Sequence, residues 1–127
     1  MNTLDTKKEF SLVKRAKSFA NAGRGIYVFI RSTPNAWIHF AILAAAVALG
    51  FYFDITREEW MMLVFVSGFV IVSEAFNTAI EIDMDLTSPQ YHPYARDTKD
   101  VAAGAVLISS ITALIIGIMI FGKYLWQ

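Results

Sequence analysis

The chain has 127 residues, 56% of them hydrophobic, and its 11 basic and 11 acidic residues give a formal net charge of zero. At this length one domain is expected, covering residues 1–127. Because the chain has no cysteine, disulfide scaffolds and thiolate metal or redox chemistry are excluded. No nucleic-acid partner is expected.

Residues 10–30 are predicted to form an amphipathic surface helix. Their apolar side chains follow helical spacing, and the polar side chains Lys14, Lys17, Asn21 and Arg24 lie largely off that line. Such a helix lies in the membrane interface with its basic face toward anionic headgroups or phosphates. Simple attachment to the membrane explains the pattern equally well.

Residues 36–53 are predicted to form the first transmembrane span. Thr33 and Pro34 favour a helix start here, with a hydroxyl cap followed by proline at the first helical position. The run is long enough to cross a bilayer and contains one titratable group, His39. For His39 we favour a structural hydrogen bond over a chemical role.

The second span is predicted over residues 60–80, where Glu74 is the only titratable group. Thr56 and Glu59 precede it with the spacing of a capping box.

Four polar residues follow one another along this helix at spacings of 3, 4 and 4: Glu74, Asn77, Glu81 and Asp85. On a helix these spacings give a single polar stripe on one face. A carboxylate in or at the edge of a membrane is costly, so this stripe is the main functional candidate.

A loop with two prolines is predicted after Asp85, and the third span over residues 101–121. Asp97 is expected to cap this helix, with Asp100 three residues later. Lys99 would then lie in the first turn, where the helix dipole disfavours a cation. That position suggests that Lys99 is placed to meet an anion.

The basic residues are distributed unevenly around the three spans. Arg57 and Lys123 lie on one side, and nine lie on the other: Lys7, Lys8, Lys14, Arg15, Lys17, Arg24, Arg31, Arg96 and Lys99. This bias predicts a cytoplasmic N-terminus and a cytoplasmic second loop. The polar stripe therefore approaches the cytoplasmic face, with Glu74 roughly 10 Å deeper than Glu81.

This arrangement favours phosphoryl transfer. Magnesium is commonly held by one or two carboxylates together with substrate phosphates, and transfer also needs positive charge and a base near the acceptor hydroxyl. Glu81 can serve a nucleotide from the cytosol, while the deeper Glu74 can serve a hydroxyl at headgroup level. Three spans enclose a polar site poorly, so an oligomer is expected.

The segments EAFNTAIE at 74–81 and KDVAAGAVL at 99–107, with Asp85, Tyr91 and His92 between them, resemble the bacterial diacylglycerol kinase and undecaprenol kinase family. The resemblance implies an all-α homotrimer in the bacterial inner membrane, with a surface helix, three spans per subunit and active sites shared between subunits. It also implies transfer of the ATP γ-phosphate to a membrane lipid alcohol, with magnesium as cofactor. The KDVAAGAVL block and the segment 35–39 look more like the undecaprenol type than the diacylglycerol type.

The resemblance also implies roles for individual residues. Glu74 looks like the catalytic base and Glu81 like a metal ligand that also serves the nucleotide. Asn77 and Asp85 match supporting polar positions, and Asn35 and His39 join Glu74 on the lipid-substrate side. The remaining nucleotide contacts would be Lys14, Asn21, Tyr91, His92, Lys99 and Asp100.

Thr33 departs from the family pattern, which has a second metal-binding glutamate two residues before the asparagine matching Asn35. A threonine leaves Glu81 as the only carboxylate ligand that the resemblance supplies. Thr33 could still face the metal or could simply cap the helix at Pro34. Two alternatives of another class are an ion-coupled carrier and a trimeric membrane protein that has lost kinase activity.

Overall fold

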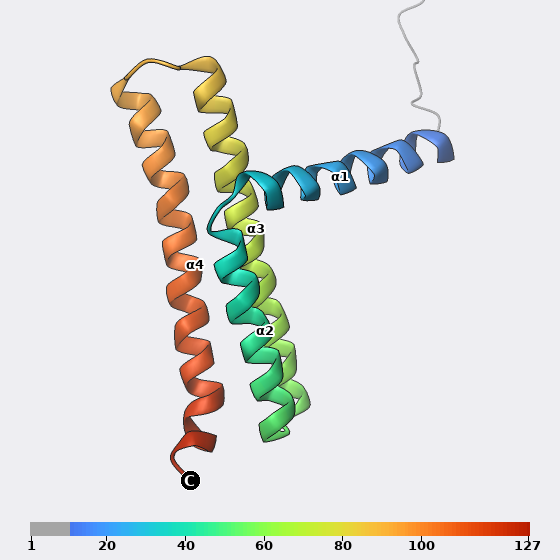
Figure 1. Ribbon diagram of the computed structural model, residues 1–127, viewed down its shortest axis with the longest axis vertical. Helices are drawn as coiled ribbons and strands as arrows, with labels where there is room; N and C mark the ends of the chain where they lie inside the picture. Colours follow the sequence, from blue (N-terminus) through green and yellow to red (C-terminus); the bar gives the residue numbers. More distant parts are fainter. Residues whose placement is uncertain (1–10) are drawn as a thin grey trace, which may run out of the picture.

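The computed structural model describes residues 11–127 as four helices (Figure 1). They are α1 (Leu12–Ser32), α2 (Ala36–Phe53), α3 (Arg57–Thr87) and α4 (Pro93–Leu125). No strand occurs in this range, which confirms the predicted all-α class. The helices α2, α3 and α4 run side by side, whereas α1 projects to one side of them (Figure 1). Lys7 and Lys8, which contributed to the charge asymmetry, lie outside the described residues.

Three of these helices, α2, α3 and α4, are long and apolar enough to cross a membrane, as predicted. The 31 residues of α3 and the 33 residues of α4 correspond to roughly 46 and 50 Å, against about 30 Å for the hydrocarbon core. Both helices therefore exceed a bilayer crossing. The C-terminal part of α3, which carries the polar stripe, lies beside the first turns of α4, and the short loop of residues 88–92 joins the two helices (Figure 1).

The predicted capping box at the start of α3 is confirmed. The Glu59 backbone N–H donates to Thr56 Oγ1 at 3.2 Å, and the Thr56 N–H donates to Glu59 Oε2 at 2.9 Å. The two bonds satisfy donors that the first helical turn leaves without partners, so α3 has a defined start.

The predicted helix start at Thr33 and Pro34 is wrong. Thr33 ends α1, because its N–H donates to the Phe29 carbonyl at 3.0 Å. Pro34 lies in the turn, and α2 begins one residue after Asn35, whose side chain makes no capping bond. The Thr33 hydroxyl is engaged with α3 and is not free to cap α2.

The predicted start of the last helix is also wrong. His92 caps α4 through Nδ1, which accepts from the Tyr94 N–H at 3.2 Å, and Pro93 takes the first helical position that suits its fixed φ. Asp97 and Asp100 therefore lie inside the helix. Lys99 is in its second turn, so the argument from a first-turn cation does not apply to it.

The buried apolar core lies at the end of the bundle opposite the 88–92 loop, and it consists of Ile55, Leu63, Ile120 and Phe121. At the same end the Glu59 carboxylate accepts a hydrogen bond from the Tyr124 hydroxyl at 2.8 Å and pairs with Lys123. These contacts fix the start of α3 to the end of α4. The polar stripe of α3 thus lies toward the other end, next to the 88–92 loop.

Candidate functional site

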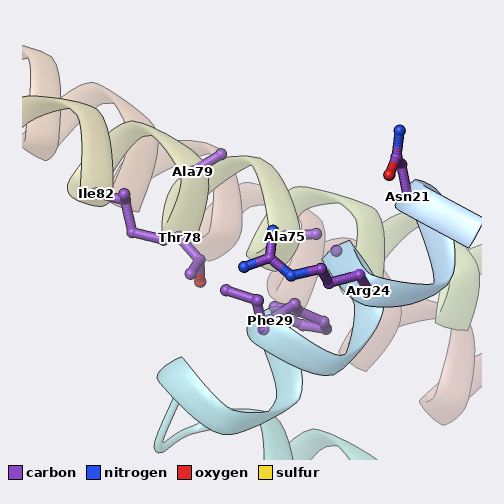
Figure 2. A pocket seen from close by; sticks show the side chains of 9 residues that line it. Asn21, Arg24, Phe29, Ala75, Thr78, Ala79 and Ile82 are labelled. Carbon is purple, nitrogen blue, oxygen red and sulfur yellow. The ribbon is translucent and has the colours of Figure 1, made fainter.

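The surface of α1 carries two predicted nucleotide contacts, Lys14 and Asn21. Lys14 is exposed in the first turn of α1, a helix that projects away from the other three (Figure 1). Asn21 lines a pocket of ≈350 Å³ between α1 and α3, where the Arg24 side chain reaches toward α3 (Figure 2). Asn21 therefore shares a pocket with Thr78 and Ile82, on the turns of α3 beside Glu81, whereas Lys14 does not line this pocket.

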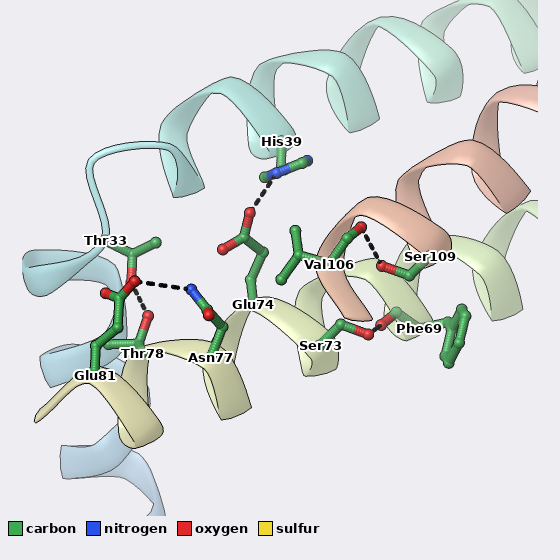
Figure 3. A network of polar contacts seen from close by, with 10 residues as sticks. All are labelled: Thr33, His39, Phe69, Ser73, Glu74, Asn77, Thr78, Glu81, Val106 and Ser109. Carbon is green, nitrogen blue, oxygen red and sulfur yellow. Dashed lines mark hydrogen bonds and ion pairs between the residues drawn. The ribbon is translucent and has the colours of Figure 1, made fainter. Parts of the chain in front are cut away.

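The turn between α1 and α2 contacts α3 through two threonines. Thr33 Oγ1 and Thr78 Oγ1 are 2.5 Å apart, and both residues are buried, at 7% and 5% exposure. The pair anchors the end of α1 to the middle of the polar stripe, between the turns that carry Glu74 and Glu81 (Figure 3). Asn35, predicted on the lipid side, is exposed beside this turn.

Glu74 is the most deeply buried member of the polar stripe. Only 5% of the residue is exposed, and its Oε1 lies 2.7 Å from His39 Nε2 (Figure 3). A buried carboxylate is tolerated only with such a partner. The bond agrees with the hydrogen-bonding role expected for His39, but the sequence did not indicate Glu74 as its partner.

Toward the loop, the stripe opens to solvent. The Asn77 amide donates to Glu81 Oε1 at 3.3 Å, and Asp85 Oδ1 accepts from Lys99 Nζ at 2.5 Å. Glu81 and Asp85 are exposed. The exposure of the carboxylates therefore increases from Glu74 to Glu81 and Asp85, in the same direction as the predicted decrease in depth along α3.

The Asp85–Lys99 ion pair was not predicted. It joins the last turns of α3 to the second turn of α4, 14 residues apart in the chain. Lys99 therefore has a structural partner, and an incoming anion would have to share or displace it. Asp100, next to it, is exposed.

The 88–92 loop presents an aromatic and basic edge. Tyr91 is largely exposed, and its hydroxyl accepts from Arg96 Nη1 at 3.3 Å. Arg96 also donates to Asp97 Oδ1 at 2.9 Å, and the His92 ring lies 5.5 Å from that of Tyr94. Tyr91 and His92 thus directly precede α4, the helix that carries Lys99, and His92 Nδ1 is already used as its cap.

The stripe contains oxygen donors suited to a hard cation, although no group of three acidic or histidine side chains that could hold one occurs in residues 11–127. Glu81 offers an exposed carboxylate, and beside it Asn77 has a buried carbonyl oxygen without a hydrogen-bond partner. Magnesium held by one carboxylate and substrate phosphates fits this donor set. Thr33 offers only a neutral hydroxyl oxygen, which is buried and hydrogen-bonded to Thr78.

The paired residues missed by sequence reasoning left only a weak signal. His39 and Glu74 are the lone histidine and the lone acidic side chain of their spans, and both fall near the end predicted to be cytoplasmic when the spans are laid antiparallel. That coincidence of depth was available from the sequence. Thr33 and Thr78 gave no such signal, since threonines are common in both settings.

Comparison with known proteins gives one family and several relatives. The family described as prokaryotic diacylglycerol kinase matches residues 20–121. An undecaprenol kinase of Bacillus subtilis is 37% identical over 121 residues, covering 95% of this chain and 97% of that protein. A diacylglycerol kinase of Helicobacter pylori is 27% identical over 124 residues, covering 92% and 94%. A diacylglycerol kinase of Synechocystis is 35% identical over 101 residues, covering 79% of this chain and 58% of that protein.

Proposed function

Because this chain belongs to the prokaryotic diacylglycerol kinase family and is a lipid kinase, we propose that it transfers the γ-phosphate of ATP to undecaprenol at the cytoplasmic face of a bacterial inner membrane. We assign this activity to a single domain over residues 1–127. The relatives named as kinases give no support to an ion-coupled carrier or to a protein without catalysis.

The observation that carries this proposal is the graded polar stripe of α3. Its buried end has one carboxylate, Glu74, whose Oε1 is held by His39 and whose Oε2 makes no hydrogen bond in the described part of the chain. Its open end has Glu81 and the Asp85–Lys99 pair. A lipid hydroxyl can thus reach the base from the membrane, while a nucleotide reaches the carboxylates from the cytosol.

In the proposed reaction Glu74 accepts the hydroxyl proton as the lipid oxygen attacks the γ-phosphorus. The bond from that phosphorus to the bridging oxygen breaks, and ADP leaves. Lys99 would turn from Asp85 to the phosphates, and Asp100 and Tyr91 would complete the nucleotide contacts together with His92. Bound magnesium would neutralise phosphate charge, held by Glu81 with support from Asn77.

The remaining nucleotide contacts, Lys14 and Asn21, lie on α1, which projects away from the start of α4 (Figure 1), the part of that helix that carries Lys99. We propose that they belong to the site of a neighbouring subunit in a homotrimer. Large apolar side chains exposed on α3 and α4, such as Phe65, Val72, Leu107 and Ile118, leave ample surface for contact with lipid or with other subunits.

The preference for undecaprenol rests on the Bacillus subtilis relative. Its identity is 37%, against 27% for the diacylglycerol kinase of Helicobacter pylori at similar coverage. The lipid tail itself would meet only apolar side chains, so the site gives no separate indication of the acceptor. Diacylglycerol is therefore the competing substrate in the assay.

The proposal is tested on purified full-length protein in vesicles that contain undecaprenol or diacylglycerol, with ATP radiolabelled at the γ-phosphate. Glu74→Gln keeps the shape and hydrogen bonding of the side chain but removes the proton acceptor, so transfer should fall by about 10²-fold or more. Nucleotide binding, measured by calorimetry, should survive.

Ser73→Ala is the matched control, because the Ser73 hydroxyl only bonds the Phe69 carbonyl of its own helix, at 2.8 Å. It should retain the wild-type rate. Near-normal turnover in Glu74→Gln would exclude Glu74 as the base. Stronger labelling of diacylglycerol than of undecaprenol would show that diacylglycerol is the preferred substrate.

A further inference from the structure

The hydrogen bond between His39 and Glu74 joins the only histidine and the only acidic side chain of two predicted membrane spans. His39 Nε2 and Glu74 Oε1 are 2.7 Å apart, and the side chains are 23% and 7% exposed. The contact comes from the first turns of α2 and the middle of α3, 35 residues apart in the chain. It is therefore a tertiary contact in the most buried part of the polar stripe.

The bond divides the two oxygens of the Glu74 carboxylate. Oε1 is engaged by the imidazole, whereas Oε2 makes no hydrogen bond with any residue in the range 11–127. When Glu74 is ionised, Nε2 must carry the hydrogen and donate it, which also fixes the tautomer of a neutral ring. One oxygen of the carboxylate is therefore free to accept a proton while the other keeps its bond to His39.

A single strong contact also limits the motion of the Glu74 side chain. A glutamate has three rotatable torsions, and a base that is misplaced by about 1 Å can lose about 10²-fold in rate. In Figure 3 the carboxylate points from α3 toward His39 on α2. The rigid helix α2 therefore decides where the second oxygen of the base lies.

We propose that His39 is the positioning residue of this lipid kinase: its Nε2 holds Glu74 Oε1 so that Oε2 is presented to the acceptor hydroxyl. This inference rests on the proposed role of Glu74 as the base. It replaces the earlier placement of His39 among the lipid contacts, because the ring nitrogen nearest the site already faces Glu74. His39 then affects the rate of transfer and leaves the binding of both substrates largely unchanged.

The test uses the full-length protein in vesicles with the lipid that the wild type phosphorylates. His39→Leu removes the donor, and kcat should fall by about 10- to 10²-fold, while KM for ATP and for lipid stays within about twofold. His39→Gln places an amide N–H near the position of Nε2 and should stay within about threefold of wild type. Ile38→Val, on the exposed side of the same turn, is the matched control.

The decisive comparison is made in the Glu74→Gln background. If His39 acts through the carboxylate, adding His39→Leu there should not lower the residual rate further, because effects within one unit are not additive. A further loss equal to that in the wild-type background would overturn the proposal. So would a raised KM for lipid with kcat unchanged, or a His39→Gln variant as slow as His39→Leu.

A second measurement does not depend on turnover. The chain has only two histidines, so the imidazole ¹⁵N spectrum is assigned with His39→Leu alone. In the wild type the His39 ring should have its hydrogen on Nε2, and Glu74→Leu should remove that preference. An unchanged His39 signal in Glu74→Leu would overturn the inference even if a variant assembles poorly.

The outcomes separate this inference from the proposed function. Failure of the wild type to label either lipid, or full activity of Glu74→Gln, would contradict the function or the base. An inactive Glu74→Gln together with a fully active His39→Leu would leave the base in place and overturn only the role of His39.

Discussion

At the scale of single residues, the departure at Thr33 has a physical explanation in its partner. Its hydroxyl lies 2.5 Å from that of Thr78, and both residues are buried. One hydroxyl donates and the other accepts, so each has a hydrogen-bond partner in the other. The position therefore supports the junction of α1 with α3.

This account predicts the outcome of a double-mutant cycle at the two threonines. Thr33→Val should destabilise the protein by about 1–3 kcal/mol, because the Thr78 hydroxyl is left buried without a partner. Thr33→Val with Thr78→Val should recover most of the loss, since both polar groups are replaced by apolar groups of similar shape. The measurement is the unfolding midpoint in detergent micelles; purely additive losses would contradict the pairing.

At the scale of helices, close approach of α2 to α3 depends on Gly50. A Cβ atom at this position would lie 2.6 Å from Trp60 Cη2 and 2.8 Å from Cζ2. The indole is rigid and packs against the buried core at this end of the bundle. The glycine therefore lets the end of α2 lie directly on the first turns of α3.

Gly50→Ala should accordingly lower the free energy of unfolding by about 1–3 kcal/mol, the usual effect of overpacking. Gly117→Ala is the matched control, because a Cβ there meets no atom within 4 Å of the described residues. The comparison is again made by unfolding in detergent. Equal stability of the two variants would show that α2 and α3 can separate at this end without loss.

At the scale of the whole molecule, one chain does not assemble the proposed nucleotide site. Lys14 lies on the projecting helix α1, and Lys99 lies beside the 88–92 loop (Figure 1). A site shared between subunits would bring them together. It would also cover part of the large apolar surface of α3 and α4.

A mixing experiment tests this arrangement. Lys14→Met and Lys99→Met should each reduce transfer as single species, since each removes a cation from the nucleotide. Co-expression of the two variants should restore part of the activity, because some sites in mixed oligomers receive both wild-type lysines. No recovery above the sum of the separate variants would indicate that each chain forms its own site. Full activity of the Lys14→Met variant alone would show that Lys14 is not part of the nucleotide site.

The sequence by itself determined the features that depend on local order. Hydropathy defined three helices able to cross a membrane, the spacing of Glu74, Asn77 and Glu81 defined a polar stripe, and Thr56 with Glu59 defined the start of α3. Each follows from neighbours within a turn or from the length of an apolar run. The motifs in α3 and α4 were also sufficient to identify the family.

Only the tertiary structure decided which polar groups meet. The bonds His39–Glu74, Thr33–Thr78 and Asp85–Lys99 join different helices. They depend on how each helix is rotated about its axis, and spans that are apolar on every side give little indication of that rotation. The start of α4 was missed because His92 and Pro93 provide a cap before Asp97 can act as one. A local sequence pattern predicts that a helix forms, whereas the packing of the helices determines which side chains of other helices it contacts.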